Sequence, residues 1–186
     1  MAAPGTRTAF WLGFLGWYPF FVMVFDVVPF KVVTVDGPSM SPAVNPPRTG
    51  AGTGGTATGW RRDRVLVDTS RTSLAYLGSK PSLQRGDVVL LHPPDSGKTD
   101  IIKRIVALEG DWVSVPGGRD PVKVPPGHCW VEGDNHVRSD DSRAFGPVPV
   151  ALVLGRATHV LWPPDRAGTR LTRWVEAGRV MGLSRT

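Results

Sequence analysis

The sequence contains one cysteine, Cys129, in 186 residues. An intrachain disulfide is therefore excluded, the redox compartment is left open, and the thiol is expected to be buried and inert. The four histidines show no metal-ligand spacing, so no metal site and no cofactor are expected. No zinc-finger, helix-turn-helix or RNA-recognition pattern occurs. The net charge of +6 is scattered along the chain, and an anionic membrane surface explains it at least as well as nucleic acid. Nucleic acid is not an expected partner.

Glycine and proline are abundant, with 22 and 18 residues, which favours many turns over a helical bundle. A hydrophobic fraction of 41% is enough for an ordinary core. The length allows one anchor and one compact domain, with little left for a second.

A long apolar segment lies near the N-terminus. Residues 9–25 carry no charge, and the run continues to Phe30 if Asp26 is tolerated, which is about the length that a helix needs to cross a bilayer. A buried helix and a cleaved signal peptide are the alternatives; the latter lacks a small-x-small cleavage site here. Residues 1–30 are predicted to be a tail and a single transmembrane anchor in the lipid bilayer. Arg7 precedes the span, so the N-terminus is expected on the side of the membrane where positively charged residues are enriched.

The remainder predicts a compact, mostly β domain over residues 31–164, with an antiparallel, barrel-like sheet. Its expected strands are bounded by turn-forming residues. Residues 45–64 are rich in Gly, Thr, Pro and Arg, and are predicted to be a flexible insertion. Residues 165–186 are interpreted as a basic, weakly amphipathic tail. The expected strands cover residues 31–35, 88–91, 101–108, 112–115, 122–124, 129–132 and 157–162, and short ordered pieces are expected at 65–67 and 74–77.

Ser39 lies between turn-forming residues, in Val-Asp-Gly-Pro-Ser-Met-Ser-Pro. A serine hydroxyl is a weak nucleophile unless a base removes its proton, and no histidine is near it in sequence. Lysine can replace histidine in this role when burial lowers its pKa. Lys103 has the most apolar neighbours of the five lysines, on a predicted strand where Arg104 should point to the opposite face. A solvated surface lysine is the plain alternative.

Four blocks occur in order between Asp36 and Val148: G-x-S-M-x-P, R-G-D-V-V, K-R-I-V-A-L-E-G-D and G-D-N-x-x-x-S-x-D-S-R-x-F-G-P-V. Together they resemble the membrane-bound type I signal peptidases, which use a Ser-Lys dyad. The segments I-I-K-R-I-V-A-L-E-G-D, V-K-V-P-P-G-H-C-W-V-E-G-D-N and A-T-H-V-L-W-P-P-D-R further resemble the mitochondrial inner membrane protease, in particular its subunit 2.

The resemblance implies roles for matching residues. Ser39 corresponds to the nucleophile, whose own N–H helps to bind the oxyanion, and Lys103 corresponds to the general base. The remaining correspondences are a lysine-orienting hydroxyl at Ser139, a bracing ion pair at Asp141 and Arg143, and a cleft-lining methionine at Met40. Some bacterial relatives place a second oxyanion hydroxyl at the position of Gly37, where this chain has none. Bacterial enzymes can also carry a large domain where only residues 109–132 intervene here.

These resemblances imply a hydrolase of the mitochondrial inner membrane that removes sorting peptides from precursor proteins on the intermembrane-space side, paired with a homologous subunit. The substrate is expected to be an extended segment with a small residue before the scissile bond. A bacterial signal peptidase I and a non-catalytic scaffold subunit are the alternatives. The endoplasmic-reticulum enzyme is disfavoured because it has histidine at the lysine position, and a self-cleaving repressor would carry a DNA-binding domain.

Overall fold

A computed structural model describes residues 30–47, 61–70, 82–94, 99–116 and 120–181. Residues 1–29 of the predicted anchor and the ordered piece expected at 74–77 lie outside these ranges, whereas Phe30, the predicted end of the anchor, instead begins the first strand. Of the helices within them, none is long and apolar enough to span a bilayer.

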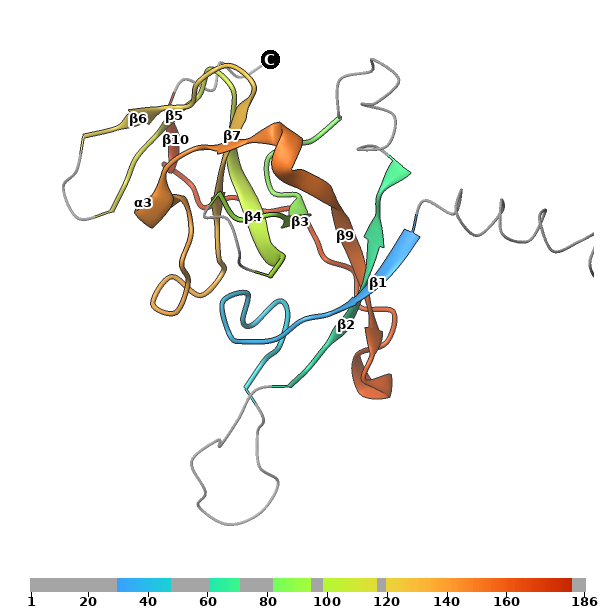
Figure 1. The fold of residues 1–186 in the computed structure, drawn as a ribbon. Coiled ribbons are helices and arrows are strands. Elements are labelled where there is room, and N and C mark those ends of the chain that lie inside the picture. The colour runs from blue at the N-terminus through green and yellow to red at the C-terminus, as the bar shows by residue number, and fades with distance from the viewer. Residues whose placement is uncertain (1–29, 48–60, 71–81, 95–98, 117–119, 182–186) are drawn as a thin grey trace, which may run out of the picture.

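The described chain is mostly β, and all its strand pairs are antiparallel. A curled seven-stranded sheet has the order β1-β2-β9-β3-β4-β7-β8, and a three-stranded sheet, β10-β5-β6, lies beside it (Figure 1). The mostly β, antiparallel architecture predicted from the sequence is therefore confirmed. The large sheet consists of β1 (Phe30–Thr34), β2 (Arg64–Asp68), β3 (Val88–Leu91), β4 (Ile101–Leu108), β7 (His128–Glu132), β8 (Val148–Pro149) and β9 (Val153–Trp162). The small sheet consists of β5 (Trp112–Val113), β6 (Val122–Lys123) and β10 (Val180–Met181).

Short helical turns complete the fold: α3 (Ser142–Phe145), η2 (Val150–Leu152) and η3 (Pro164–Arg166). The strand β4 is central and covered on both faces, because its six inner residues are all buried. Its run of apolar residues is the pattern expected for such a strand. Its bounds agree with the prediction, whereas β9 begins at Val153, four residues before the predicted start. The short strands β8 and β10 were not predicted.

The predicted flexible insertion at residues 45–64 is wrong at both ends. Asn45 and Asp63 are fully buried, and Arg64 begins β2. The Asn45 N–H donates to Asp63 Oδ2 at 3.0 Å, and the Asp63 N–H donates to Asn45 Oδ1 at 2.7 Å. Composition could not show this pair, because each partner satisfies the other across 18 residues of sequence. Residues 48–60 lie outside the described part of the chain.

The interpretation of residues 165–186 as a tail is also wrong over the residues that the structure describes. Residues 170–181, which we call the C-terminal strap, run back across the domain. Leu171 belongs to the core cluster that includes Val65 and Ala157, which we call the first core cluster. Arg179 is paired with the buried Glu132, and β10 extends the small sheet through Val180 and Met181. The strap is thus an integral layer of the fold, and apart from the single turn η3 just before it, residues 165–181 contain no helix.

The Arg85-Gly86-Asp87 turn, just before the strand predicted at residues 88–91, is where the strap docks. Gly86 has φ of +85°, and a Cβ there would lie 2.8 Å from the backbone nitrogen of Trp174. Asp87 is almost fully buried and pairs with Arg173 of the strap. Glycine therefore supplies both the left-handed turn and the space for the strap backbone.

Candidate functional site

Three segments distant in sequence meet around Ser39. The serine lies in the loop after β1, Lys103 lies on β4, and the loop after β7 supplies Gly133 and Asn135. Lys103 Nζ donates to Ser39 Oγ at 3.1 Å, across 64 residues of sequence. The lysine is 3% exposed, and the serine is half-buried. A buried amine thus contacts a hydroxyl that is still open to solvent on one side.

The electrostatic surroundings lower the pKa of Lys103. Burial is the main cause, since the ammonium form loses its hydration among aliphatic neighbours, and the Arg143 guanidinium adds to the effect. The carboxylates of Asp141 and Asp140 act in the opposite direction but do not cancel the shift. A lower pKa makes the neutral amine more accessible, and only the neutral amine can accept a proton.

The backbone around the serine is fixed from several directions. The Ser41 N–H donates to the Pro38 carbonyl at 3.0 Å, and the Asn135 N–H donates to the Ser39 carbonyl at 3.0 Å. Gly133 lies so near that a Cβ on it would come closer than 3.0 Å to the Ser39 carbonyl oxygen and to Ser139 Oγ. The glycine of the Gly-Asp-Asn block is therefore required by close packing against the serine loop.

Asp141 and Arg143 form the ion pair expected from the sequence. Arg143 Nε and Nη2 donate to the two carboxylate oxygens of Asp141 at 2.8 and 2.9 Å, and the Gly133 N–H donates to the same carboxylate at 3.0 Å. Burial of Asp141 acts to raise its pKa, but these hydrogen bonds outweigh it, so the pKa is lowered. Asp141 also caps the N-terminus of α3 through the Arg143 N–H. The pair therefore links α3 to the loop that packs on Ser39.

Ser139, Met40 and Gly37, the other predicted site residues, make no hydrogen bond to the Ser39 and Lys103 side chains among the described residues. The Ser139 hydroxyl is buried beside Asp141 and helps to lower the pKa of that carboxyl, but among the described residues it makes no hydrogen bond of good geometry, to Lys103 or to any other group. Met40 is 1% exposed and packs in the first core cluster, so its side chain does not line an open cleft. Gly37 is exposed, with φ of +87° and open space where a side chain would project.

Sequence reasoning missed a polar group behind the serine loop. Asn45 Nδ2 donates to the carbonyls of Val35 at 2.8 Å and Gly37 at 2.9 Å. Arg166 pairs with Asp63 and donates to the Ala43 carbonyl at 2.8 Å. The available signal was the lone Asn45 after Met-Ser-Pro-Ala-Val, since asparagine tolerates the left-handed region and has φ of +53° here.

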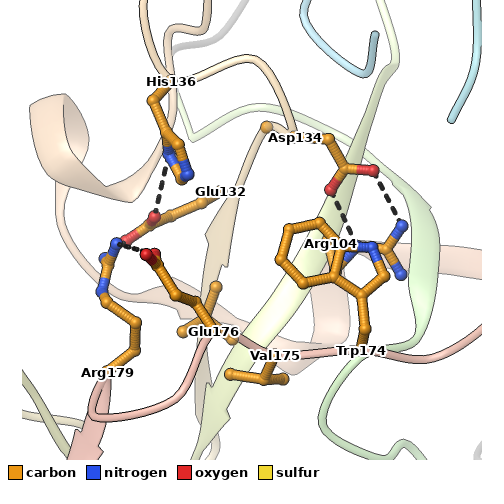
Figure 2. A pocket seen from close by; sticks show the side chains of 10 residues that line it. Arg104, Glu132, Asp134, His136, Trp174, Val175, Glu176 and Arg179 are labelled. Atoms are coloured by element: carbon orange, nitrogen blue, oxygen red, sulfur yellow. Dashed lines mark hydrogen bonds and ion pairs between the residues drawn. The ribbon is translucent and has the colours of Figure 1, made fainter. Parts of the chain in front are cut away.

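Arg104 points away from the serine, as strand alternation predicts, into a pocket on the other face of β4 (Figure 2). Its guanidinium makes two bonds to Asp134, at 2.7 and 2.8 Å, and stacks on Trp174 with 5.0 Å to the ring centroid. Glu132, which also lines this pocket, pairs with Arg179 and faces His136. These charges are matched in pairs, so this face ties the strap to the sheet.

Within the described ranges, no group of three or more His, Cys, Asp or Glu residues is arranged to hold a metal ion.

Comparison with known proteins gives a consistent result. The family model described as signal peptidase, peptidase S26, matches residues 9–122 and 118–162. The mouse (Mus musculus) protein named mitochondrial inner membrane protease subunit 2 is 42% identical over 159 residues, 85% of this chain and 81% of that protein. The zebrafish (Danio rerio) protein of the same name is 40% identical, covering 85% of this chain and 78% of its own. The human (Homo sapiens) subunit 1 of that protease is 35% identical, covering 71% of this chain and 69% of its own. A solved signal peptidase I from Enterococcus faecalis aligns with 42% of this chain and 98% of its own, at 27% identity and a TM-score of 0.35.

Proposed function

This chain belongs to the signal peptidase family, peptidase S26, and we propose that Ser39 is its nucleophile and Lys103 its general base. It is a serine peptidase of the mitochondrial inner membrane. The observation that supports the two roles is the 3.1 Å approach of Lys103 Nζ to Ser39 Oγ, made by a lysine that is 3% exposed.

In the proposed reaction, the neutral Lys103 amine takes the hydroxyl proton while Ser39 Oγ attacks the scissile carbonyl. The tetrahedral oxyanion accepts a hydrogen bond from the Ser39 N–H. When the C–N bond breaks, the Lys103 ammonium returns its proton to the departing amine. A water molecule then gives a proton to Lys103 and attacks the ester carbon, which releases the new carboxyl end and restores both side chains.

The surrounding residues are assigned supporting roles. Asp141 and Arg143 brace the loop that packs on the serine, and their opposite effects on the Lys103 pKa partly offset each other. Ser139 is proposed to orient the lysine when substrate binds. Met40 is proposed to support the substrate cleft from within the core. Because Gly37 has no hydroxyl, a backbone donor or water is proposed as the second oxyanion donor.

The proposed substrates are precursor proteins with sorting signals, delivered to the outer face of the inner membrane. An extended segment with a small residue before the scissile bond would add to an edge of the sheet. Relatives carry the names subunit 1 and subunit 2, which supports pairing with a homologous subunit. We further propose that residues 1–29 anchor the chain as one span, with the β domain that begins at Phe30 and the strap together facing the intermembrane space.

The test uses the full chain in its membrane, with processing of precursor proteins as the readout. Ser39→Ala and Lys103→Ala should each abolish processing, while Ser114→Ala and Lys123→Ala should leave it unchanged. If precursors are processed normally by both dyad variants, the chain is a scaffold and the proposal is wrong. Resistance of its membrane association to salt but not to detergent tests the anchor.

A further inference from the structure

The loop that carries Ser39 is held on its inner side by one amide side chain. Asn45 is fully buried, and each of its side-chain polar atoms has a partner: Nδ2 donates to the Val35 and Gly37 carbonyls, and Oδ1 accepts from the Asp63 N–H. Its backbone N–H donates to Asp63 Oδ2. A buried asparagine with every hydrogen-bonding group used is a strongly determined position, because losing any partner leaves a buried polar group unpaired.

These bonds control the direction of the Ser39 N–H. The bond from Asn45 to the Gly37 carbonyl, at 2.9 Å, fixes the peptide plane between Gly37 and Pro38. The proline ring then fixes its own φ, so only one backbone rotation separates that plane from the Ser39 N–H. The Ser41 N–H holds the Pro38 carbonyl at 3.0 Å, which fixes this last plane as well.

The next peptide plane is fixed from the opposite side, where the Asn135 N–H donates to the Ser39 carbonyl at 3.0 Å. Three consecutive planes, from Gly37 to Met40, are thereby held by three different donors. Asn45 is the one donor of the three that is a side chain. It can therefore be replaced without altering the backbone connectivity of the loop.

Asn45 is itself supported from behind. Asp63 forms an ion pair with Arg166, and Arg166 Nη2 also donates to the Ala43 carbonyl at 2.8 Å. Asp63 is fully buried, and the Arg166 side chain is 15% exposed. The Asn45 N–H and Arg166 Nη1 both donate to Asp63 Oδ2, so Arg166 pairs the charge of the buried carboxylate at the same oxygen that Asn45 uses, whereas Oδ1 has no partner among the described residues.

We propose that Asn45 is a positioning residue for the nucleophile loop, which orients the Ser39 N–H and Oγ and acts on the reaction only through that loop. This inference rests on the proposed roles of Ser39 and Lys103. Its consequence is a loss in turnover with little change in substrate affinity, since Asn45 is buried and does not line the cleft. A misplacement of reacting groups by about 1 Å can cost on the order of 100-fold in rate.

The test compares the Asn45→Gly variant with wild type. Glycine can keep the left-handed conformation, but the two hydrogen bonds from Asn45 Nδ2 to the Val35 and Gly37 carbonyls are lost. The substrate is an internally quenched peptide that has alanine before the scissile bond. For the variant we expect kcat to fall at least about tenfold while KM stays within about twofold. Val113→Ala is the matched control: Val113 is fully buried in a different core cluster, so it should lower the melting temperature and leave kcat unchanged.

Arg166→Gln is the second variant and serves if Asn45→Gly fails to fold. It withdraws the support behind Asn45, so kcat should fall in the same direction by a smaller factor, again at constant KM. The inference is overturned if the folded Asn45→Gly variant, or Arg166→Gln where only that one folds, keeps the wild-type kcat. If Ser39→Ala and Lys103→Ala are inactive in the same assay, such a result removes the role of Asn45 and leaves the dyad standing. If those two variants are active, the proposed function itself fails.

Discussion

Lys103 and Arg104 are neighbours on β4 and equally buried, at 3% exposure, yet their side chains leave the strand in opposite directions. Lys103 meets the uncharged Ser39 hydroxyl, whereas Arg104 meets the Asp134 carboxylate in the pocket of Figure 2. Arg104 is thus held in an ion pair on its side of the strand. An amine facing a neutral hydroxyl has a lowered pKa and can change its protonation state during a reaction.

The pH dependence of cleavage should report this difference. If Lys103 is the base, kcat/KM rises with pH through the Lys103 pKa, and this limb lies below the ordinary value of 10.5. Asp140 raises that pKa, so Asp140→Asn should move the limb to lower pH and make the variant faster than wild type on its acidic side. Asp120→Asn, at an exposed position, is the control. A limb that does not move in Asp140→Asn contradicts the assignment.

Lys103→Met should abolish activity and stabilise the fold by roughly 1 kcal/mol at neutral pH, because a buried cationic group is exchanged for an apolar side chain of similar length. In the wild type, the unfolded lysine binds more protons than the folded one between the lowered pKa and 10.5, so stability rises with pH across that window. The advantage of the variant should accordingly shrink as pH rises. Urea unfolding at several pH values measures it, and a less stable variant would contradict the argument.

Gly133→Ala should destabilise the protein by about 2 kcal/mol and strongly reduce kcat, because the new methyl group would displace the Ser39 carbonyl or the Ser139 hydroxyl. Gly110→Ala provides the comparison. Gly110, unlike Gly133, has a positive φ, of +87°, and open space around its Cβ position, so a backbone penalty of about 1 kcal/mol should appear without a loss of kcat. Equal activity losses in the two variants would show that packing against Ser39 is not the cause.

Arg179→Ala should cost about 3 kcal/mol, because it leaves the buried Glu132 carboxylate without its cation. Chemical denaturation of the variant and of Arg170→Ala, an exposed arginine in the same strap, separates this loss from a general effect of arginine removal. A change within about 0.5 kcal/mol would mean that the strap is not energetically coupled to the sheet.

The native Cys129 thiol should be unreactive toward disulfide reagents at pH 8. It is fully buried, and burial raises its pKa to about 12, so the thiolate is scarce as well as inaccessible. One equivalent of thiol should appear in guanidinium chloride. Rapid modification of the folded protein would indicate that β7 opens locally.

Sequence patterns predicted the strands that are covered on both faces and missed the contacts made by polar groups far apart in the chain. Residues 101–108 are almost continuously apolar, so β4 was predicted with its observed bounds. The strap mixes apolar and charged residues without a clear strand or helix period, and it is also held by Arg173 and Arg179, whose partners lie 86 and 47 residues away. Periodicity carries no information on such pairs.

The same distinction holds for the site. Ser39 and Lys103 were predicted because chemistry and family resemblance both single them out, and the structure places them in contact. Asn45 was assigned to a flexible segment because residues 45–64 are rich in glycine, threonine, proline and arginine. Its role depends on the carbonyls of Val35 and Gly37, which become available only once β1 has turned into the serine loop.

The reciprocal bonds between Asn45 and Asp63 have a consequence for engineering. They close the chain on itself next to the serine loop, so that Asn45 and Asp63 fix the two ends of the segment that connects them. Doubling the length of a closed loop costs only about 0.6 kcal/mol in entropy. An epitope or a reporter peptide inserted between residues 48 and 60 should therefore leave peptide cleavage intact, which makes this stretch a suitable attachment point for following the protein in its membrane.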